Sequence, residues 1–111
     1  MTKARIPTLS RGAFSAVLNH GQRVQTSLMT VFWRRAGRLA VGIAVSRKFR
    51  TAVQRNRARR RLREVLRQHF ELVPEGTEVI WVLQPEVAEV PFPLLVQEFK
   101  RTLEILRKRE S

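Results

Sequence analysis

The sequence predicts a single small α+β domain in which helices pack on a central, mostly antiparallel sheet. Its 111 residues are enough for one domain with one core, and 43% of them are hydrophobic, as in a folded protein. Segments with strand period and segments with helix period follow one another in the order α-β-β-β-α-β-α. No repeat or long linker divides the chain, so we expect residues 10–109 to form one domain after a flexible basic arm at residues 1–9.

The first expected element is a helix over residues 11–19. Ser10 has a side chain that caps helix N-termini, and Gly21 suits the position just after a helix C-terminus. A brief strand around Val24 is expected next. Alternation between two sets of side chains then predicts a longer strand over residues 28–33.

Gly37 suits a hairpin turn, and a strand over residues 39–46 is expected to follow it. Bulky and small residues alternate along this strand, so one of its faces carries only small side chains. The small residues are Ala40, Gly42, Ala44 and Ser46. Such a face would allow a helix to pack closely against the strand.

A long basic helix is expected to begin at Thr51. Thr51 and Gln54 have the spacing of a capping box, a signature of helix N-termini. Apolar residues at helical spacing predict one buried stripe along this helix. The stripe consists of Ala58, Leu62, Val65, Leu66 and Phe70.

Pro74 and Gly76 end the helical unit, and a near-continuous apolar run over residues 78–85 predicts a strand covered on both faces. Trp81 lies inside this run and is therefore expected in the core. A last helix is expected to follow the two prolines Pro91 and Pro93 and to end at about Arg109.

Residues 55–63 concentrate six arginines in nine positions. Four arginine pairs around this stretch have i,i+4 spacing, and each should cost about 0.2–0.5 kcal/mol in an isolated helix. A merely solvated surface does not need this concentration of like charge, whereas an anionic partner would relieve it. The net charge of +13 makes nucleic acid the leading partner class, ahead of an acidic membrane surface.

The side chains show no evident chemistry of their own. The absence of cysteine excludes disulfides, thiolate nucleophiles and sulfur-based zinc sites. His20 and His69 have no carboxylate at ligand spacing, and the nine acidic residues show no two-metal pattern. No apolar stretch has the length of a signal peptide core or a membrane span, so a cytoplasmic protein without membrane association is expected. Aromatic residues could instead stack on unpaired bases, and the candidates are Phe14, Phe32 and Trp33.

The stretch from Ser46 to Glu64 resembles the signature of the bacterial ribonuclease P protein subunit. The matching residues are Ser46, Arg47, Lys48, Ala52, Val53, Arg55, Asn56, Arg57, Arg59, Arg60, Arg63 and Glu64. The N-terminal LSRGAFSAVLNHG is similar to the first helix and following turn of that family, so the resemblance covers residues 9–107. Two positions depart from the pattern: Arg50 stands where glycine is frequent, and Arg61 stands where an apolar residue is common.

The resemblance implies a protein that partners a large catalytic RNA, which removes the 5′ leader from precursor tRNA. It implies that Mg²⁺, or a similar divalent ion, is held chiefly by the RNA, with no cofactor and no catalytic side chain in the protein. It also implies a left-handed βαβ crossover, against the general right-handed rule. The implied contacts to the catalytic RNA are Arg47, Lys48, Arg55, Asn56, Arg57, Arg59, Arg60 and Arg63. The implied leader cleft, between the sheet face and the first helix, consists of Phe14, Leu18, Met29, Val31 and Trp33.

Other functions remain open on composition alone. A basic RNA-binding or ribosome-associated protein without enzymatic activity has the same size and charge. The missing acid cluster disfavours an autonomous nuclease, and so dense an arginine run leaves little to distinguish DNA base pairs. No feature of the sequence predicts an obligatory protein partner.

Overall fold

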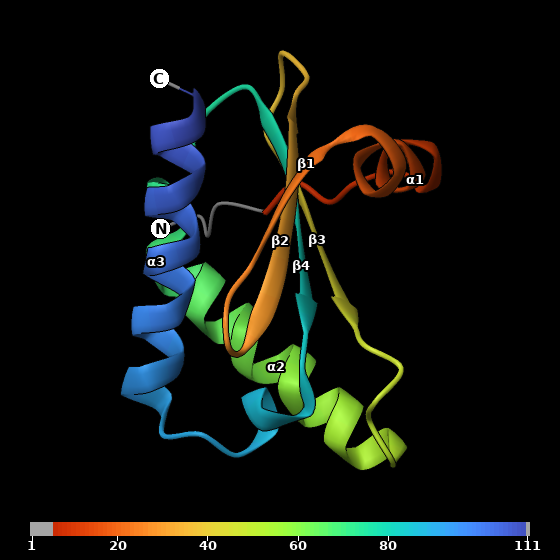
Figure 1. Ribbon diagram of the computed structural model, residues 1–111, viewed down its shortest axis with the longest axis vertical. Helices are drawn as coiled ribbons and strands as arrows, with labels where there is room; N and C mark the ends of the chain where they lie inside the picture. The colour runs from red at the N-terminus through yellow and green to blue at the C-terminus, as the bar shows by residue number, and fades with distance from the viewer. Residues whose placement is uncertain (1–5, 111) are drawn as a thin grey trace, which may run out of the picture.

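The computed structural model describes residues 6–110, which fold into three α-helices and one four-stranded sheet (Figure 1). The elements confirm the expected α-β-β-β-α-β-α order, and their boundaries lie within two residues of the expected ones. The two short 3₁₀ helices, η1 and η2, were not expected. In chain order the elements are α1 (Arg11–His20), β1 (Gln22–Gln25), β2 (Met29–Arg35), β3 (Ala40–Val45), α2 (Ala52–His69), η1 (Phe70–Leu72), β4 (Thr77–Leu83), η2 (Pro85–Ala88) and α3 (Phe92–Glu110).

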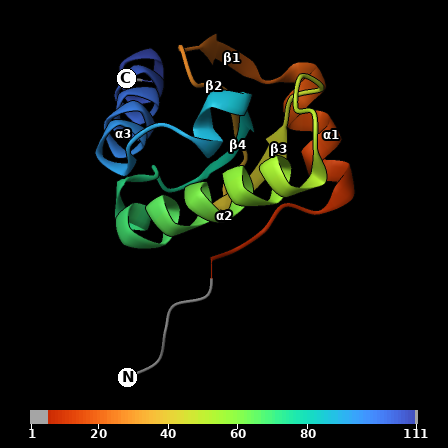
Figure 2. The same ribbon diagram turned by 90° about the horizontal axis from the view of Figure 1, so that it is seen from below.

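The sheet has the strand order β1-β2-β4-β3. The β1–β2 and β2–β4 pairs are antiparallel, while β3 and β4 are parallel. The chain therefore crosses from β3 through α2 to β4, and this crossover is left-handed, as the family resemblance implied (Figures 1 and 2). Helices α2 and α3 cover one face of the sheet, and α1 lies on the other (Figures 1 and 2).

The main hydrophobic core fills the space between the sheet and the pair α2 and α3. The expected stripe of α2 supplies Ala58, Leu62, Val65 and Leu66 to this core, with Phe70 partly buried beside it. Trp81 is fully buried, as expected. Its ring lies 5.1 Å from that of Phe99, and its indole Nε1 donates a hydrogen bond of 3.1 Å to Thr102 Oγ1.

A second, smaller layer joins α1 to the opposite face of the sheet. Val17 of α1 is fully buried there, and Ala40 and Ile80 are buried on the strands. A Cβ atom at Gly42 would lie 2.8 Å from Cε2 of Phe14, so any larger residue would force the Phe14 ring to shift. The small face expected for β3 is therefore the face on which α1 packs.

The segment just before α1 pairs with the outer edge of β3. The Leu9 N–H donates to the Val41 carbonyl oxygen at 3.1 Å, and the Val41 N–H donates to the Pro7 carbonyl oxygen at 3.0 Å. The expectation of a flexible arm is thus wrong for residues 7–9, because an open strand edge offers them backbone partners. Residues 1–5, the rest of the expected arm, lie outside the described residues.

Helix α2 begins where the capping signature places it. Thr51 Oγ1 accepts a hydrogen bond of 3.1 Å from the Gln54 N–H, while Gln54 Oε1 accepts one of 3.4 Å from the Arg50 N–H. The return bond of the box thus goes to Arg50 rather than to the cap residue itself. No non-glycine residue among residues 6–110 has a positive φ, so the fold accommodates arginine at position 50 without that strain.

Arg61 differs from the other arginines of α2 because it points toward η2 and the residues just after it. Its guanidinium donates hydrogen bonds to the carbonyl oxygens of Val87, at 2.8 Å, and of Val90. Burial lowers the pKa of Arg61, and the nearby charge of Arg57 lowers it further. Arg61 therefore fastens the segment after β4 to α2 and is part of the fold.

Glu98 on α3 fastens the turn between β1 and β2 in a similar way. Its Oε2 accepts hydrogen bonds from Ser27 Oγ at 3.0 Å and from the Leu28 N–H at 3.4 Å. Burial acts to raise the pKa of the Glu98 carboxyl, but hydrogen bonds from Thr26, Ser27 and Leu28 together outweigh burial. The pKa of Glu98 consequently lies below its ordinary value.

Replacing Arg61 with methionine should destabilise the protein. Methionine keeps an unbranched side chain but cannot donate to the two carbonyl oxygens, and hydrogen bonds from charged donors contribute about 1.5–3 kcal/mol each. We expect a loss of about 1–3 kcal/mol in the free energy of unfolding, measured by urea denaturation. Arg60→Met, on the exposed side of the same helix, should stay within about 0.5 kcal/mol of wild type. Equal effects of the two substitutions would show that the Arg61 bonds contribute nothing.

The Glu98 contacts should make stability depend on pH in acid. A group with a depressed folded pKa stabilises the protein above its unfolded pKa, about 4.3 for glutamate, and loses that contribution as pH falls through the folded pKa. The stability difference between wild type and Glu98→Gln should therefore be full at pH 6 and should shrink progressively below about pH 4. Thermal melts of both proteins from pH 6 to pH 3 measure this difference. A difference that does not change over this range would contradict the assignment.

Candidate nucleic-acid interface

Apart from Arg61, the arginines of α2 lie on the side of the helix that faces away from the core. Asn56, Arg59, Arg60 and Arg63 line a shallow hollow of about 420 Å³ on this side. Arg59 Nη1 donates a hydrogen bond of 3.5 Å to Asn56 Oδ1, so the two side chains lean toward each other. The apolar stripe fixes this arrangement, because burying Ala58, Leu62 and Leu66 turns the arginines that line the hollow outward.

Acidic side chains pair with the arginines at the end of β2 and in the turn that follows it. Glu78 is only 3% exposed, and it accepts from Arg34 Nε at 2.7 Å and from Arg38 Nε at 3.2 Å. Glu110, at the end of α3, accepts from Arg35 Nε at 3.1 Å and from the Trp33 indole at 3.0 Å.

On α2, by contrast, no ion pair within residues 6–110 involves the outward-facing arginines that the sequence singled out. These arginines are Arg55, Arg57, Arg59, Arg60 and Arg63. Glu64 pairs with Arg67, one turn further along the helix. The first three turns of α2 thus carry positive charge that the described chain does not compensate, which favours an anionic partner.

The turn between β3 and α2 extends this basic surface. Arg47 and Lys48 are exposed there, and the Lys48 N–H donates to Ser46 Oγ at 3.3 Å. Val53, in the first turn of α2, is 77% exposed. The structure thus brings all eight residues expected to contact the catalytic RNA onto one helix and the turn that leads into it.

The face of the sheet under α1 is the second part of the candidate interface. Here the structure corrects the residues that the sequence analysis predicted for the cleft. Phe14 and Leu18 lie on α1 and are half-buried, in keeping with a cleft position. Met29, Val31 and Trp33, however, are 0% exposed and belong to the core with α2 and α3. The expectation that these three residues line the cleft is wrong, because they point to the other face of β2.

The aromatic residue of β2 that reaches the α1 face is Phe32. The strand registers pair Phe32 with Ile80 and Ile80 with Gly42, and register partners share a face of the sheet. Gly42 contacts Phe14, so Phe32 lies on the same face as α1. Phe32 is half-buried, and the Arg23 guanidinium carbon lies 5.8 Å from its ring centroid. Alternation along β2 did not show which of its two faces lies under α1. The small face of β3 could have shown it, because that is the face on which α1 packs.

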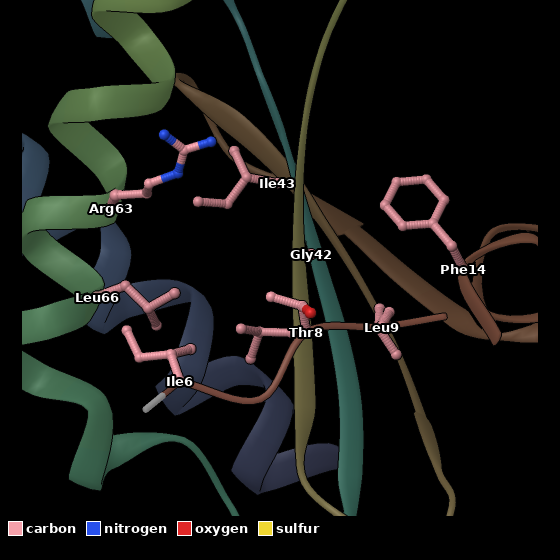
Figure 3. Close-up of a pocket in the computed structure, with 9 residues that line it drawn as sticks. Ile6, Thr8, Leu9, Phe14, Gly42, Ile43, Arg63 and Leu66 are labelled. Carbon is pink, nitrogen blue, oxygen red and sulfur yellow. The ribbon is translucent and has the colours of Figure 1, made fainter. Parts of the chain in front are cut away.

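A groove of about 310 Å³ crosses the outer edge of β3 between α1 and α2 (Figure 3). Phe14 lies on one side of β3, and Arg63 and Leu66 lie on the other (Figure 3). The paired N-terminal segment contributes Ile6, Thr8 and Leu9. Phe14 and Arg63 had been expected in two separate sites, and the tertiary structure places them in one cavity.

Residues 6–110 contain no group of three or more histidine, cysteine, aspartate or glutamate side chains that could hold a metal ion. Within the same part of the chain, no helix combines the length and apolarity needed to cross a bilayer. What this surface offers is therefore cationic and aromatic binding groups.

Comparison with known proteins gives a consistent result. The sequence profile of the family described as Ribonuclease P matches residues 4–107. The ribonuclease P protein component of Symbiobacterium thermophilum is 36% identical over 98 residues, which cover 86% of this chain and 85% of that protein. The Thermus oshimai protein component is 40% identical over 86 residues, which cover 78% of this chain and 55% of that longer protein.

Solved structures agree with this result. The ribonuclease P protein from Thermotoga maritima superposes with a TM-score of 0.77 at 26% identity, over 89% of this chain and 96% of that one. The Staphylococcus aureus ribonuclease P protein has the same fold, with a TM-score of 0.75 at 19% identity, over 93% of this chain and 96% of that one. The arginine-rich crossover helix, the left-handed connection and these likenesses lead to one conclusion: the chain belongs to the ribonuclease P protein family.

Proposed function

We propose that this chain is the protein subunit of ribonuclease P and that it aids removal of the 5′ leader from precursor tRNA in the cytoplasm. In this proposal α2 binds the catalytic RNA, and the sheet face under α1 binds the single-stranded leader. The observation that carries the proposal is the set of uncompensated arginines on α2, next to a sheet face that presents half-buried aromatic rings.

The contact with the catalytic RNA is electrostatic. Arginine presents a planar fork of donors that fits phosphate oxygens, and such contacts orient a protein without reading bases. The contacts assigned to the catalytic RNA are exposed or half-buried residues of α2 and of the turn that leads into it: Arg47, Lys48, Arg55, Asn56, Arg57, Arg59, Arg60 and Arg63. A folded RNA can approach many of them together, because its phosphates are also arranged in space. This contact would relieve the repulsion between neighbouring arginines of the free protein.

The leader contact is mainly stacking. Unpaired bases stack on exposed aromatic rings, with about 1–3 kcal/mol per base. Phe14 and Leu18 on α1 and Phe32 on β2 share the sheet face on which α1 packs. Arg23 stands over the Phe32 ring and adds a positive charge beside it. This combination suits a flexible single strand better than a rigid duplex.

The chemistry of cleavage is assigned to the RNA in this proposal. The described residues offer no carboxylate cluster that fits Mg²⁺, so the divalent ion is assigned to the catalytic RNA. The protein would contribute by holding substrate and RNA together and by neutralising phosphate charge between them. Both effects matter most when divalent ions are scarce.

Reconstitution tests the proposal directly. The purified protein alone should leave precursor tRNA intact, while its addition to a bacterial ribonuclease P RNA should raise the cleavage rate at low Mg²⁺. Cleavage at the mature 5′ end is measured on gels with end-labelled substrate, with RNA alone and protein alone as controls. Site-specific cleavage by protein without RNA, or no stimulation of the RNA at any Mg²⁺ concentration, would refute the proposal.

The arginines of α2 should contribute to RNA binding at some cost in stability. Replacing Arg55 and Arg59 together with glutamine removes two repulsive i,i+4 pairs, so the free energy of unfolding should be unchanged or should rise by about 0.4–1 kcal/mol. Affinity for the catalytic RNA should fall. The slope of log K against log salt should fall by about 1.4–1.8 if two phosphate contacts are lost.

The matched control replaces Lys100 and Arg101, on the exposed side of α3, with glutamine. This variant loses the same two charges, but it should keep most of the salt dependence. Clear destabilisation of the α2 variant with an unchanged salt slope would mean that Arg55 and Arg59 serve the fold.

A further inference from the structure

The β2–β3 hairpin carries a second group of arginines, at the end of the sheet away from the start of α2 (Figure 1). Arg34 lies on β2, and Arg38 follows the turn at Gly37. Strand β3 then runs from this hairpin toward α2, and its six residues span about 20 Å at about 3.3 Å per residue. The hairpin arginines are therefore separate from the basic side of α2.

Glu78 lies beneath both of these arginines and pairs with each. Its side chain is only 3% exposed, whereas the side chains of Arg34 and Arg38 are 37% and 57% exposed. Oε1 of Glu78 accepts from Arg34 Nε at 2.7 Å, and Oε2 accepts from Arg38 Nε at 3.2 Å. Glu75, three residues before Glu78, forms no ion pair within residues 6–110. One carboxylate between two guanidinium groups leaves one positive charge in excess.

Each guanidinium also has donors that the described residues do not use. A guanidinium has five N–H donors, and Nε supplies one of them. Within residues 6–110 the Nη atoms of Arg34 and Arg38 make no hydrogen bond. Because the carboxylate is buried beneath them, these donors lie on the solvent side of the cluster.

The hairpin fixes both side chains in place. Arg34 and Glu78 are register partners in the β2–β4 pair, so they share a face of the sheet. The N–H groups of Ala36 and Gly37 both donate to the Gly76 carbonyl oxygen, at 2.8 and 3.2 Å. These bonds hold the turn against the residue before β4. The two guanidinium groups are thus preorganised on one carboxylate before any ligand arrives.

We infer that Arg34 and Arg38 together bind one backbone phosphate of the catalytic RNA, as a contact separate from α2. The inference rests on the proposed function. A phosphodiester carries a single negative charge, which matches the single positive charge in excess at the cluster. Its two free oxygens can each accept from one guanidinium, since the planar donors of arginine fit phosphate oxygens. The RNA would then be held at both ends of the sheet.

The composition of the cluster favours the catalytic RNA over the single-stranded leader as the source of this phosphate. None of the residues that build the cluster is aromatic, so none of them offers a ring on which an unpaired base could stack. A preorganised pair of arginines suits a phosphate that a folded RNA already holds in position. A flexible strand would have to be ordered first, at a cost in entropy.

Arg35 provides a matched control in the same hairpin. It points to the opposite face of the sheet, where Glu110 Oε1 accepts from its Nε at 3.1 Å. Here one arginine meets one carboxylate, so no positive charge is in excess. Arg38→Gln and Arg35→Gln therefore remove the same charge from neighbouring positions, but only Arg38 belongs to the proposed site.

Affinity for the catalytic RNA is the first measurement. Arg38→Gln should weaken binding about tenfold, as expected for loss of a charge-assisted contact, and should lower the slope of log K against log salt by about 0.7–0.9. Arg35→Gln should change both quantities much less. In the reconstituted holoenzyme, the preference for leader-bearing precursor tRNA over mature tRNA should be the same in both variants as in wild type.

Melting temperatures establish that the variants fold. If Arg38→Gln melts well below wild type, Arg38→Lys takes its place in every measurement. Lysine keeps a charge for the pair with Glu78, but it lacks the second donor edge that would bind the phosphate.

Ethylation interference on the catalytic RNA locates the contact. Ethylnitrosourea converts single phosphates to neutral triesters, and the RNA molecules that still bind the protein are separated from those that do not. Wild type and Arg35→Gln should share one sensitive phosphate to which Arg38→Gln is indifferent. Arg59→Gln, on α2, should lose sensitivity at different phosphates.

Two outcomes would overturn the inference and leave the proposed function intact. One is an Arg38→Gln variant that binds the catalytic RNA no more weakly than Arg35→Gln does. The other is an interference pattern that Arg38→Gln leaves unchanged, whether or not the leader preference is lost. Failure of the proposed function is distinct, since the wild-type protein would then not stimulate cleavage at all.

Discussion

Parallel pairing of β3 with β4 is the constraint on which the rest of the molecule depends. Two parallel neighbours cannot be joined by a tight turn, so the chain between them must cross a face of the sheet, and here it does so as α2. The buried stripe of α2 fixes the rotation of the helix on that face. Once Ala58, Leu62 and Leu66 point into the core, Arg59, Arg60 and Arg63 must point away from it.

The distribution of acidic residues then separates the arginines that have partners within the fold from the arginines of α2 that have no acidic partner among the described residues. Glu78 and Glu110 pair with Arg34, Arg35 and Arg38, and Glu98 fastens the β1–β2 turn to α3. Arg61 satisfies backbone carbonyl oxygens of the segment after β4. The remaining arginines at the start of α2 repel one another in the free protein. A phosphate-rich partner would relieve that repulsion, so under the proposed function the same residues oppose stability and favour assembly.

The edge of β3 shows how one strand can serve both layers. Its inner side pairs with β4, its small face admits α1, and its outer edge holds residues 7–9 before the chain turns into α1. Because that turn comes early, the edge beyond Val41 stays open between Phe14 and Arg63. The basic side of α2 and the sheet face under α1 thus meet at one strand edge.

Local patterns in the sequence determined where α2 begins, which side of it is buried and which family the chain resembles. The capping pair Thr51 and Gln54 placed the start of α2, and its apolar spacing identified the buried side, because both signals act within a few turns of one helix. The ordered string from Ser46 to Glu64 indicated the family. Tertiary structure alone decided which face of β2 is accessible, since alternation fits either face until the neighbouring strands and α1 are in place. The tertiary structure buries Met29, Val31 and Trp33 in the core and leaves Phe32 as the residue of β2 on the α1 face. It also places Phe14 and Arg63 in one groove across β3. These relations depend on contacts between residues far apart in the chain, and no local pattern encodes them.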